Sequence, residues 1–136
     1  MKHVEHIGIA VKDLDTSISL FEKLLNTSCY KREIVESENI TTAFLKTGET
    51  KIELLEDKKQ DGVINKFIEK RGEGIHHIAF EVEDILAEIS RLKESGFIIL
   101  NEEPRKGADN KLVCFLHPKS TNSVLVELCQ QIKNSD

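Results

Sequence analysis

The chain has 136 residues, of which 39% are hydrophobic and 32% are charged, and its formal net charge is −5. This length and balance predict one folded domain and exclude a chain that is disordered throughout. No apolar run approaches the roughly 18 residues of a membrane span, and the negative net charge argues against a broad nucleic-acid surface. We therefore expect neither a membrane nor a nucleic acid as partner.

The cysteines and the N-terminal residues favour a reducing compartment. The three cysteines have no CxxC spacing and leave one thiol over, so that reduced thiols are the simplest interpretation. The first residues, MKHVEH, do not read as a secretory leader. We expect a cytoplasmic protein.

The first half of the chain predicts a strand, a helix and three more strands. Residues 3–11 alternate and are rich in Val and Ile, which is typical of a strand. Asp13 and Asp15 are candidate N-caps of a helix whose apolar residues recur at helical spacing and which ends at Asn26. Three short strands are then predicted, with polar turns between them, over residues 29–36, 41–46 and 51–56.

The second half repeats this plan after a charged connector and a short helix at about residues 61–70. A strand over 75–82 leads to a helix that begins after Asp84 and ends at Gly96. Three more strands are expected, over residues 97–100, 112–115 and 123–128. The loops 101–111 and 117–122 are longer than their counterparts, which is typical of loops that contact a ligand. The polar tail from Gln131 is expected to fray.

The two halves also repeat each other residue by residue. The segment HIGIAVKDL from His6 reads like HIAFEVEDI from His77, an offset of 77 − 6 = 71 residues. The segment IELL from Ile52 reads like VELC from Val126, so each copy has one histidine on its first strand and one glutamate on its last. The predicted fold class is α+β, with two tandem βαβββ modules that form a curved, cleft-like mixed sheet.

Four residues follow from the repeat as candidate ligands of one metal ion: His6, Glu53, His77 and Glu127. Imidazole and carboxylate ligands suit divalent Co, Mn, Ni, Fe or Zn, and an open coordination position would let a substrate carbonyl bind and become polarised. A single histidine or glutamate on a strand is more often structural or solvent-facing. Passive duplication can also preserve such residues, but their recurrence at matched positions favours a metal site.

On these residues the chain resembles the vicinal-oxygen-chelate superfamily, which includes glyoxalase I and the bleomycin-resistance proteins. Within it, HIGIAV from His6, TKIELLE from Thr50, GEGIHHIAF from Gly72, and FLHPKST from Phe115 with the following VLVEL resemble the methylmalonyl-CoA epimerase family. The resemblance covers about residues 3–130. It implies a single domain over 1–136, with module one at about 3–56, the connector helix at 61–70 and module two at about 75–130.

The resemblance implies a metal-dependent epimerase that interconverts (R)- and (S)-methylmalonyl-CoA by taking and returning the C2 proton. It also implies a divalent ion held by the four repeated residues, an acyl-CoA substrate and a homodimer. Epimerisation needs acid–base groups on two faces of C2, and Glu127 and Glu53 are the candidates. Some relatives have Gln where Glu53 stands. Some also have a further glutamate on the second strand of module one, where this chain reads NITTA from Asn39.

Basic residues gather in the C-terminal third and suggest where substrate binds. Lys106, Lys111 and Lys119, with Arg105, are candidate contacts of the CoA phosphates, although a solvated basic rim explains them equally well. His117 lies at an expected hairpin turn and is either a turn residue or part of the pocket rim, of which the rim is preferred. Two alternatives stay open: a glyoxalase I-type lactoylglutathione lyase, and a non-enzymatic small-molecule binder of the same fold.

Overall fold

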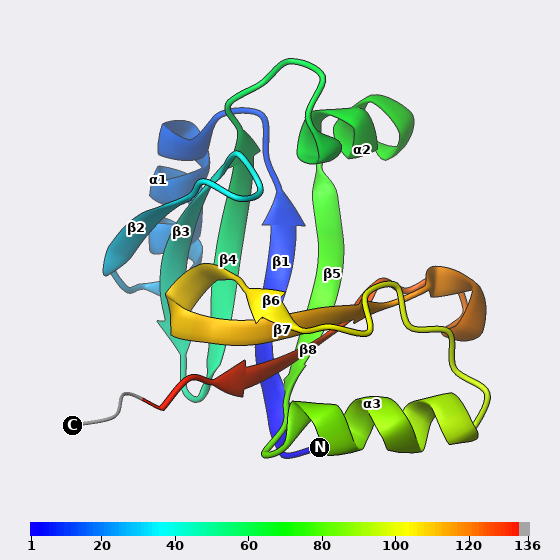
Figure 1. The fold of residues 1–136 in the computed structure, drawn as a ribbon. Helices are drawn as coiled ribbons and strands as arrows, with labels where there is room; N and C mark the ends of the chain where they lie inside the picture. The colour runs from blue at the N-terminus through cyan, green and yellow to red at the C-terminus, as the bar shows by residue number, and fades with distance from the viewer. Residues whose placement is uncertain (134–136) are drawn as a thin grey trace. The chain divides into compact units, whose positions relative to one another are not determined.

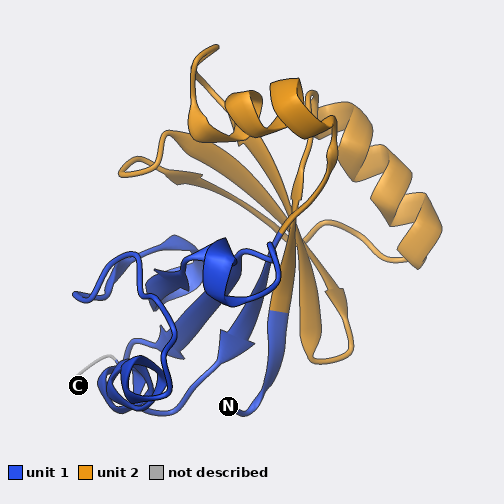
Figure 2. Ribbon diagram, turned by 90° about the vertical axis from the view of Figure 1, so that its right-hand side faces the viewer, with its two compact units in different colours: residues 1–5, 77–136 blue, residues 6–76 orange. Residues whose placement is uncertain are grey.

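The computed structural model describes residues 1–133, which divide into two compact units (Figures 1 and 2). One unit is residues 6–76, and the other combines residues 1–5 with the chain from His77 onward. The elements are β1 (His3–Ala10), α1 (Leu14–Leu25), β2 (Lys31–Val35), β3 (Ile40–Thr47), β4 (Thr50–Asp57), α2 (Val63–Arg71), β5 (Gly74–Glu81), α3 (Ile85–Glu94), β6 (Arg105–Lys106), η1 (Ala108–Asn110), β7 (Lys111–Leu116), η2 (Pro118–Ser120) and β8 (Val126–Gln131). None of the helices within residues 1–133 has the length and apolarity that crossing a bilayer requires.

The unit of residues 6–76 is a mixed sheet with two helices. Its strands lie in the order β2-β3-β4-β1, with β1 parallel to β4 and the other neighbours antiparallel. The predicted βαβββ plan of the first module is confirmed. So is the predicted helix, because Asp13 accepts a hydrogen bond from the Thr16 N–H at its start and Asn26 adopts the left-handed conformation at its end, with φ of 53°.

Each face of this sheet packs against a different helix. Leu14 and Ile18 of α1 pack on one face, in a cluster that includes Leu54 of β4. Ile64 of α2 packs on the other face, in a cluster that includes Leu55. Successive strand residues point to opposite faces, so Leu54 of β4 points to the face that packs against α1, and Leu55 points to the face that packs against α2.

The second unit repeats the plan with the strand order β5-β8-β7-β6, and with β5 parallel to β8. Its helix α3 buries an apolar stripe, Ile85, Ile89 and Leu92, against β7 and β8. The predicted N-cap is confirmed, because Asp84 accepts a hydrogen bond from the Ala87 N–H at 3.1 Å. The α+β class and the two-module plan thus hold for both halves.

Two details of the second unit differ from expectation. The strand expected over 97–100 is reduced to an isolated bridge between Ile99 and Leu116, and the loop 101–111 contains the short strand β6. Pro104 lies between them and has no N–H to continue a ladder. Gln131, where a frayed tail was expected to begin, is the last residue of β8. The end of that tail, residues 134–136, lies outside the described residues.

The helices α1 and α3 are fastened to the sheet by the same device. The Glu56 Oε2 atom accepts the Leu14 N–H at 2.7 Å, and the Gln130 Oε1 atom accepts the Ile85 N–H at 2.7 Å. Both acceptors stand three residues after the repeated glutamate, since 56 − 53 = 3 and 130 − 127 = 3. Each contact satisfies a backbone donor at a helix start and ties that helix to the glutamate-bearing strand.

Helix α2 is capped from a distance by the last residue of β4. The Asp57 Oδ2 atom accepts the Asn65 N–H at 2.7 Å, whereas the preceding residue, Gly62, supplies no side-chain cap. Gly62 has φ of −72°, a conformation open to any residue. A β-carbon there would collide with the Asp57 carboxylate. Glycine is therefore required at this position for space and not for backbone conformation.

This arrangement predicts a coupling between residues 57 and 62. Gly62→Ala should lower the free energy of unfolding by about 1–3 kcal/mol because the methyl group displaces the carboxylate. Asp57→Ala should cost about 1 kcal/mol through the lost cap. In the double variant, Gly62→Ala should reduce the free energy of unfolding much less, because the Asp57 carboxylate is no longer there. A double-mutant cycle measured by urea denaturation gives this difference. Strictly additive losses would contradict the proposed contact.

Candidate functional site

Strand register places each repeated histidine beside its glutamate. In β1 and β4, Gly8 is the partner of Glu53, and in β5 and β8, Ala79 is the partner of Glu127. Each partner stands two residues beyond the histidine of its strand, since 8 − 6 = 2 and 79 − 77 = 2. Residues two apart share a face, so in each unit the histidine and the glutamate form a diagonal pair on one face of the sheet.

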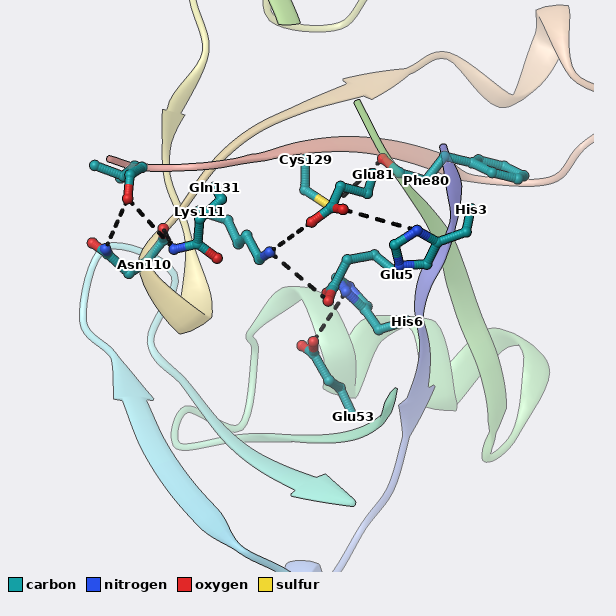
Figure 3. A network of polar contacts seen from close by, with 11 residues as sticks. His3, Glu5, His6, Glu53, Phe80, Glu81, Asn110, Lys111, Cys129 and Gln131 are labelled. Atoms are coloured by element: carbon teal, nitrogen blue, oxygen red, sulfur yellow. Dashed lines mark hydrogen bonds and ion pairs between the residues drawn. The ribbon is translucent and has the colours of Figure 1, made fainter. Parts of the chain in front are cut away.

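Both pairs are buried and in contact. The His6 Nδ1 and Glu53 Oε2 atoms are 3.0 Å apart (Figure 3), and the His77 Nε2 and Glu127 Oε1 atoms are 3.3 Å apart. All four residues are at most 6% exposed. Solvent-facing positions are therefore excluded, and groups of this kind are buried only when they are paired or when they coordinate a metal.

The separations within each pair fit the geometry of metal ligands. Imidazole nitrogen and carboxylate oxygen lie about 2.1 Å from a zinc-type ion, so two adjacent ligands are about 3.0 Å apart at a right angle and about 3.4 Å apart at the tetrahedral angle. The observed 3.0 and 3.3 Å match this range. Each pair can thus supply two neighbouring ligands to one ion.

Each glutamate strand has the histidine strand as one neighbour and, as the other, a strand with a phenylalanine beside the glutamate. Phe44 of β3 is the partner of Glu53, and Phe115 of β7 is the partner of Glu127. The two are again 115 − 44 = 71 residues apart. The Phe115 ring also meets the His77 ring edge-on, with centroids 5.9 Å apart. These apolar walls exclude water beside the carboxylates and strengthen their interaction with any bound cation.

Cys114 precedes Phe115 on β7 and belongs to the opposite face, where it packs in the α3 cluster. Burial, followed by the nearby Glu127 carboxylate, raises the pKa of the Cys114 thiol to about 11. A thiol is a nucleophile or a metal ligand only when it is deprotonated. Near neutral pH, Cys114 therefore acts as a small apolar residue.

Lys111 lies at the centre of a polar network (Figure 3). It is 4% exposed, and its Nζ atom is 3.1 Å from Glu81 Oε1 and 3.9 Å from Glu5 Oε2. Glu81 in turn lies 3.8 Å from the Nδ1 atom of His3. A buried ammonium group already paired with two carboxylates gives no support to a contact with the CoA phosphates.

The other expected substrate residues lie around the long loops of the second unit. Strand register places Arg105 opposite Val113, on the same face as Phe115, and places the exposed Lys106 on the reverse face. His117 caps η2, since its Nδ1 atom accepts the N–H of the exposed Lys119 at 3.0 Å. Lys106 thus points away from the face that bears Glu127.

The further glutamate of some relatives has no counterpart on β3. Thr42 lies there, 1% exposed, and register puts it on the face of Glu53 between Glu33 and Leu55. A threonine hydroxyl has no ionisable proton near neutral pH, so Thr42 can position a group but cannot act as an acid or a base in turnover.

An open groove of about 550 Å³ lies elsewhere in the unit of residues 6–76, between α1 and the start of β2. Asp15 and Ile18 of α1 line one side, and Arg32, which pairs with Asp15, lines the other. These residues occupy the α1 face, whereas His6 and Glu53 occupy the opposite one. Tyr30 and Lys31 at the start of β2 also line the groove, whereas His6 and Glu53 do not.

Comparison with known proteins places the chain in a family. Residues 5–115 match the model of the Glyoxalase/Bleomycin resistance protein/Dioxygenase superfamily. An ethylmalonyl-CoA/methylmalonyl-CoA epimerase of Cereibacter sphaeroides is 42% identical over 129 residues, which is 93% of this chain and 96% of that protein. The human mitochondrial methylmalonyl-CoA epimerase is 36% identical over 93% of this chain and 73% of its own length.

A solved structure agrees in fold as well as in sequence. A serine-to-threonine variant of the Streptomyces coelicolor methylmalonyl-CoA epimerase, in complex with 2-nitronate-propionyl-CoA, superposes with a TM-score of 0.91 at 31% identity. The match covers 100% of this chain and 99% of that one. The chain belongs to the Glyoxalase/Bleomycin resistance protein/Dioxygenase superfamily and, within it, groups with the methylmalonyl-CoA epimerases.

Proposed function

We propose that the protein is an epimerase that interconverts the (R) and (S) forms of methylmalonyl-CoA. The observation that carries the proposal is the buried His–Glu pair that recurs, in the same register and at 3.0 and 3.3 Å, in both units. Relatives named as epimerases, at 36–42% identity over most of the chain, support the substrate class. We further propose that residues 1–136 act as one functional domain, in a cytoplasmic homodimer.

In this proposal His6, Glu53, His77 and Glu127 together hold one divalent ion, such as Co, Mn, Ni or Zn. The donor set is two imidazoles and two carboxylates, which such ions accept without a thiolate. A bound divalent ion supplies positive charge that stabilises the negative charge developing on the thioester oxygen. For proton transfer one glutamate must be ionised and the other protonated, so the two side chains would balance one of the two positive charges of the ion.

Glu53 and Glu127 are proposed to move the proton. The C2 hydrogen is acidic because it lies between a thioester and a carboxylate. One glutamate, as the carboxylate, takes it from one face of C2 and leaves an enolate, and the other, as the carboxylic acid, gives a proton to the opposite face. The configuration inverts, and the two glutamates have exchanged protonation states. A carboxylate has two oxygens, so each residue can keep one toward the ion and one toward the substrate.

The long loops of the second unit are proposed to face the substrate. His117 and Lys119, joined by a hydrogen bond at the start of η2, remain the candidates there, and Lys119 is exposed. The positions of Lys106 and Lys111 do not favour a substrate role. No described residue favours glutathione over coenzyme A, and the relatives named as epimerases argue against a lactoylglutathione lyase.

Substitution of one glutamate should slow proton exchange for one epimer of the substrate much more than for the other. In deuterium oxide, the protein should exchange the C2 proton of both epimers. Glu127→Gln should slow the exchange of one epimer by about 10²–10⁴-fold, and Glu53→Gln that of the other, because each removes one acid–base group. Nuclear magnetic resonance measures both rates, with Glu69→Gln on the exposed face of α2 as the control. Full exchange in both variants would refute the assignment.

Removal of the metal should abolish the exchange. Dialysis against a chelator is expected to reduce the rate to that of the uncatalysed reaction, and addition of Co²⁺ or Mn²⁺ to restore it, because the enolate charge is otherwise unbalanced. The measurement is the exchange rate against added metal, with circular dichroism to verify that the chelated protein remains folded. A folded, metal-free protein with the full rate would contradict the proposed metal dependence.

A further inference from the structure

Three lysines of the first module share a sheet face with His6 and Glu53. Lys51 of β4 is the partner of His6 on β1 and of Lys46 on β3. Lys31 of β2 is the partner of Phe44, which is itself the partner of Glu53. Directly paired residues point to the same side of a sheet, so all three ammonium groups belong to the face that bears the His–Glu pair.

An exposed aromatic ring completes this cluster. Tyr30, just before β2, is 46% exposed, and its ring centroid lies 6.1 Å from that of Phe44. The Lys46 Nζ atom is 5.2 Å from the Tyr30 centroid, and the Lys31 Nζ atom is 5.1 Å from the Phe44 centroid. These contacts hold two of the cations over aromatic faces.

The charge of the cluster favours an anion. Glu33 is the acidic residue that shares this end of the face, and its Oε1 atom is 3.2 Å from Lys31 Nζ. Apart from Glu53 of the His–Glu pair, the three lysines and Glu33 have a formal charge of 3 − 1 = +2. The α2 helix meets this face at Ile40 and Leu55, toward the other end of the strands, whereas Tyr30 and Lys46 are exposed to solvent.

Aromatic rings and clustered cations together fit a nucleotide. Purine bases stack on rings such as that of tyrosine, and ammonium groups bind phosphates through charge-assisted hydrogen bonds. Neighbouring strands lie about 4.8 Å apart, so that β2 is about 10 Å from the Glu53 strand across β3. The pantetheine arm of coenzyme A is long enough to cover such a distance between its thioester and its nucleotide.

We propose that Tyr30, Lys31, Lys46 and Lys51 bind the nucleotide end of the acyl-CoA substrate, with the adenine on the Tyr30 ring and the phosphates on the lysines. This inference rests on the proposed epimerase function, because it takes the acyl group to be at Glu53. It assigns recognition of the coenzyme to the first module, whereas the sequence pointed to basic residues of the second.

Binding of coenzyme A itself tests the site without turnover. Calorimetry should show that Lys46→Gln and Lys51→Gln each weaken binding by about tenfold, the loss typical of one charge-assisted contact. Tyr30→Leu should weaken it as well. Lys23→Gln, an exposed lysine of α1, removes the same charge from the other side of the sheet and should leave the affinity unchanged. Equal affinities for Lys46→Gln, Lys51→Gln and the wild type would overturn the proposal.

A shortened substrate locates the contact on the nucleotide. With methylmalonyl-CoA, the lysine variants should raise KM at unchanged kcat; with methylmalonyl-pantetheine, which lacks the nucleotide, they should match the wild type. A KM increase with both substrates would place the lysines at the acyl end and overturn the assignment. If the wild type binds coenzyme A through these residues yet exchanges no C2 proton, the proposed function fails while the nucleotide site stands.

Discussion

The parallel pairing of the first and last strand in each module is the constraint on which the candidate site depends. It sets glutamate and histidine two residues out of register, so that their side chains meet diagonally on one face. A slip of one residue would send the glutamate to the face that packs against α1 or α3 and separate the pair. The contacts of Glu56 and Gln130 with the starts of α1 and α3 oppose such a slip, because each fixes a helix to the glutamate strand three residues further on.

The two modules share this frame but use the rest of the site face differently. In the second module, Lys111 is enclosed between Glu81 and Glu5, so that its charge is neutralised inside the protein. In the first, Lys46 is exposed and lies over the Tyr30 ring, and Lys51 is its partner on β4. The His–Glu pairs are thus alike in the two modules, while the charges around them differ. This division suits a reaction that treats two faces of one carbon alike but binds a substrate with two unlike ends.

Much of the fold was predictable from sequence because its signals are local. Asp13 and Asp84 cap their helices as expected, and the repeat identified both His–Glu pairs. What sequence could not predict depends on register and burial. Lys31, Lys46 and Lys51 are separated along the chain and become neighbours only across strands, while Lys111, which reads as one more basic rim residue, is buried. The cap from Asp57 to α2 was missed because a distant carboxylate leaves no signature at the helix start.

Metal stoichiometry distinguishes one ion held jointly by the two buried pairs, as proposed, from a separate ion at each pair. Titration of the metal-free protein with Co²⁺, followed by the visible absorption of the bound ion, should reach its end point at one ion per chain. His6→Ala and His77→Ala should each abolish this tight binding, because each removes a ligand from the same ion. An end point of two ions, or a variant that loses one ion and retains another, would show two separate sites and contradict a shared ion.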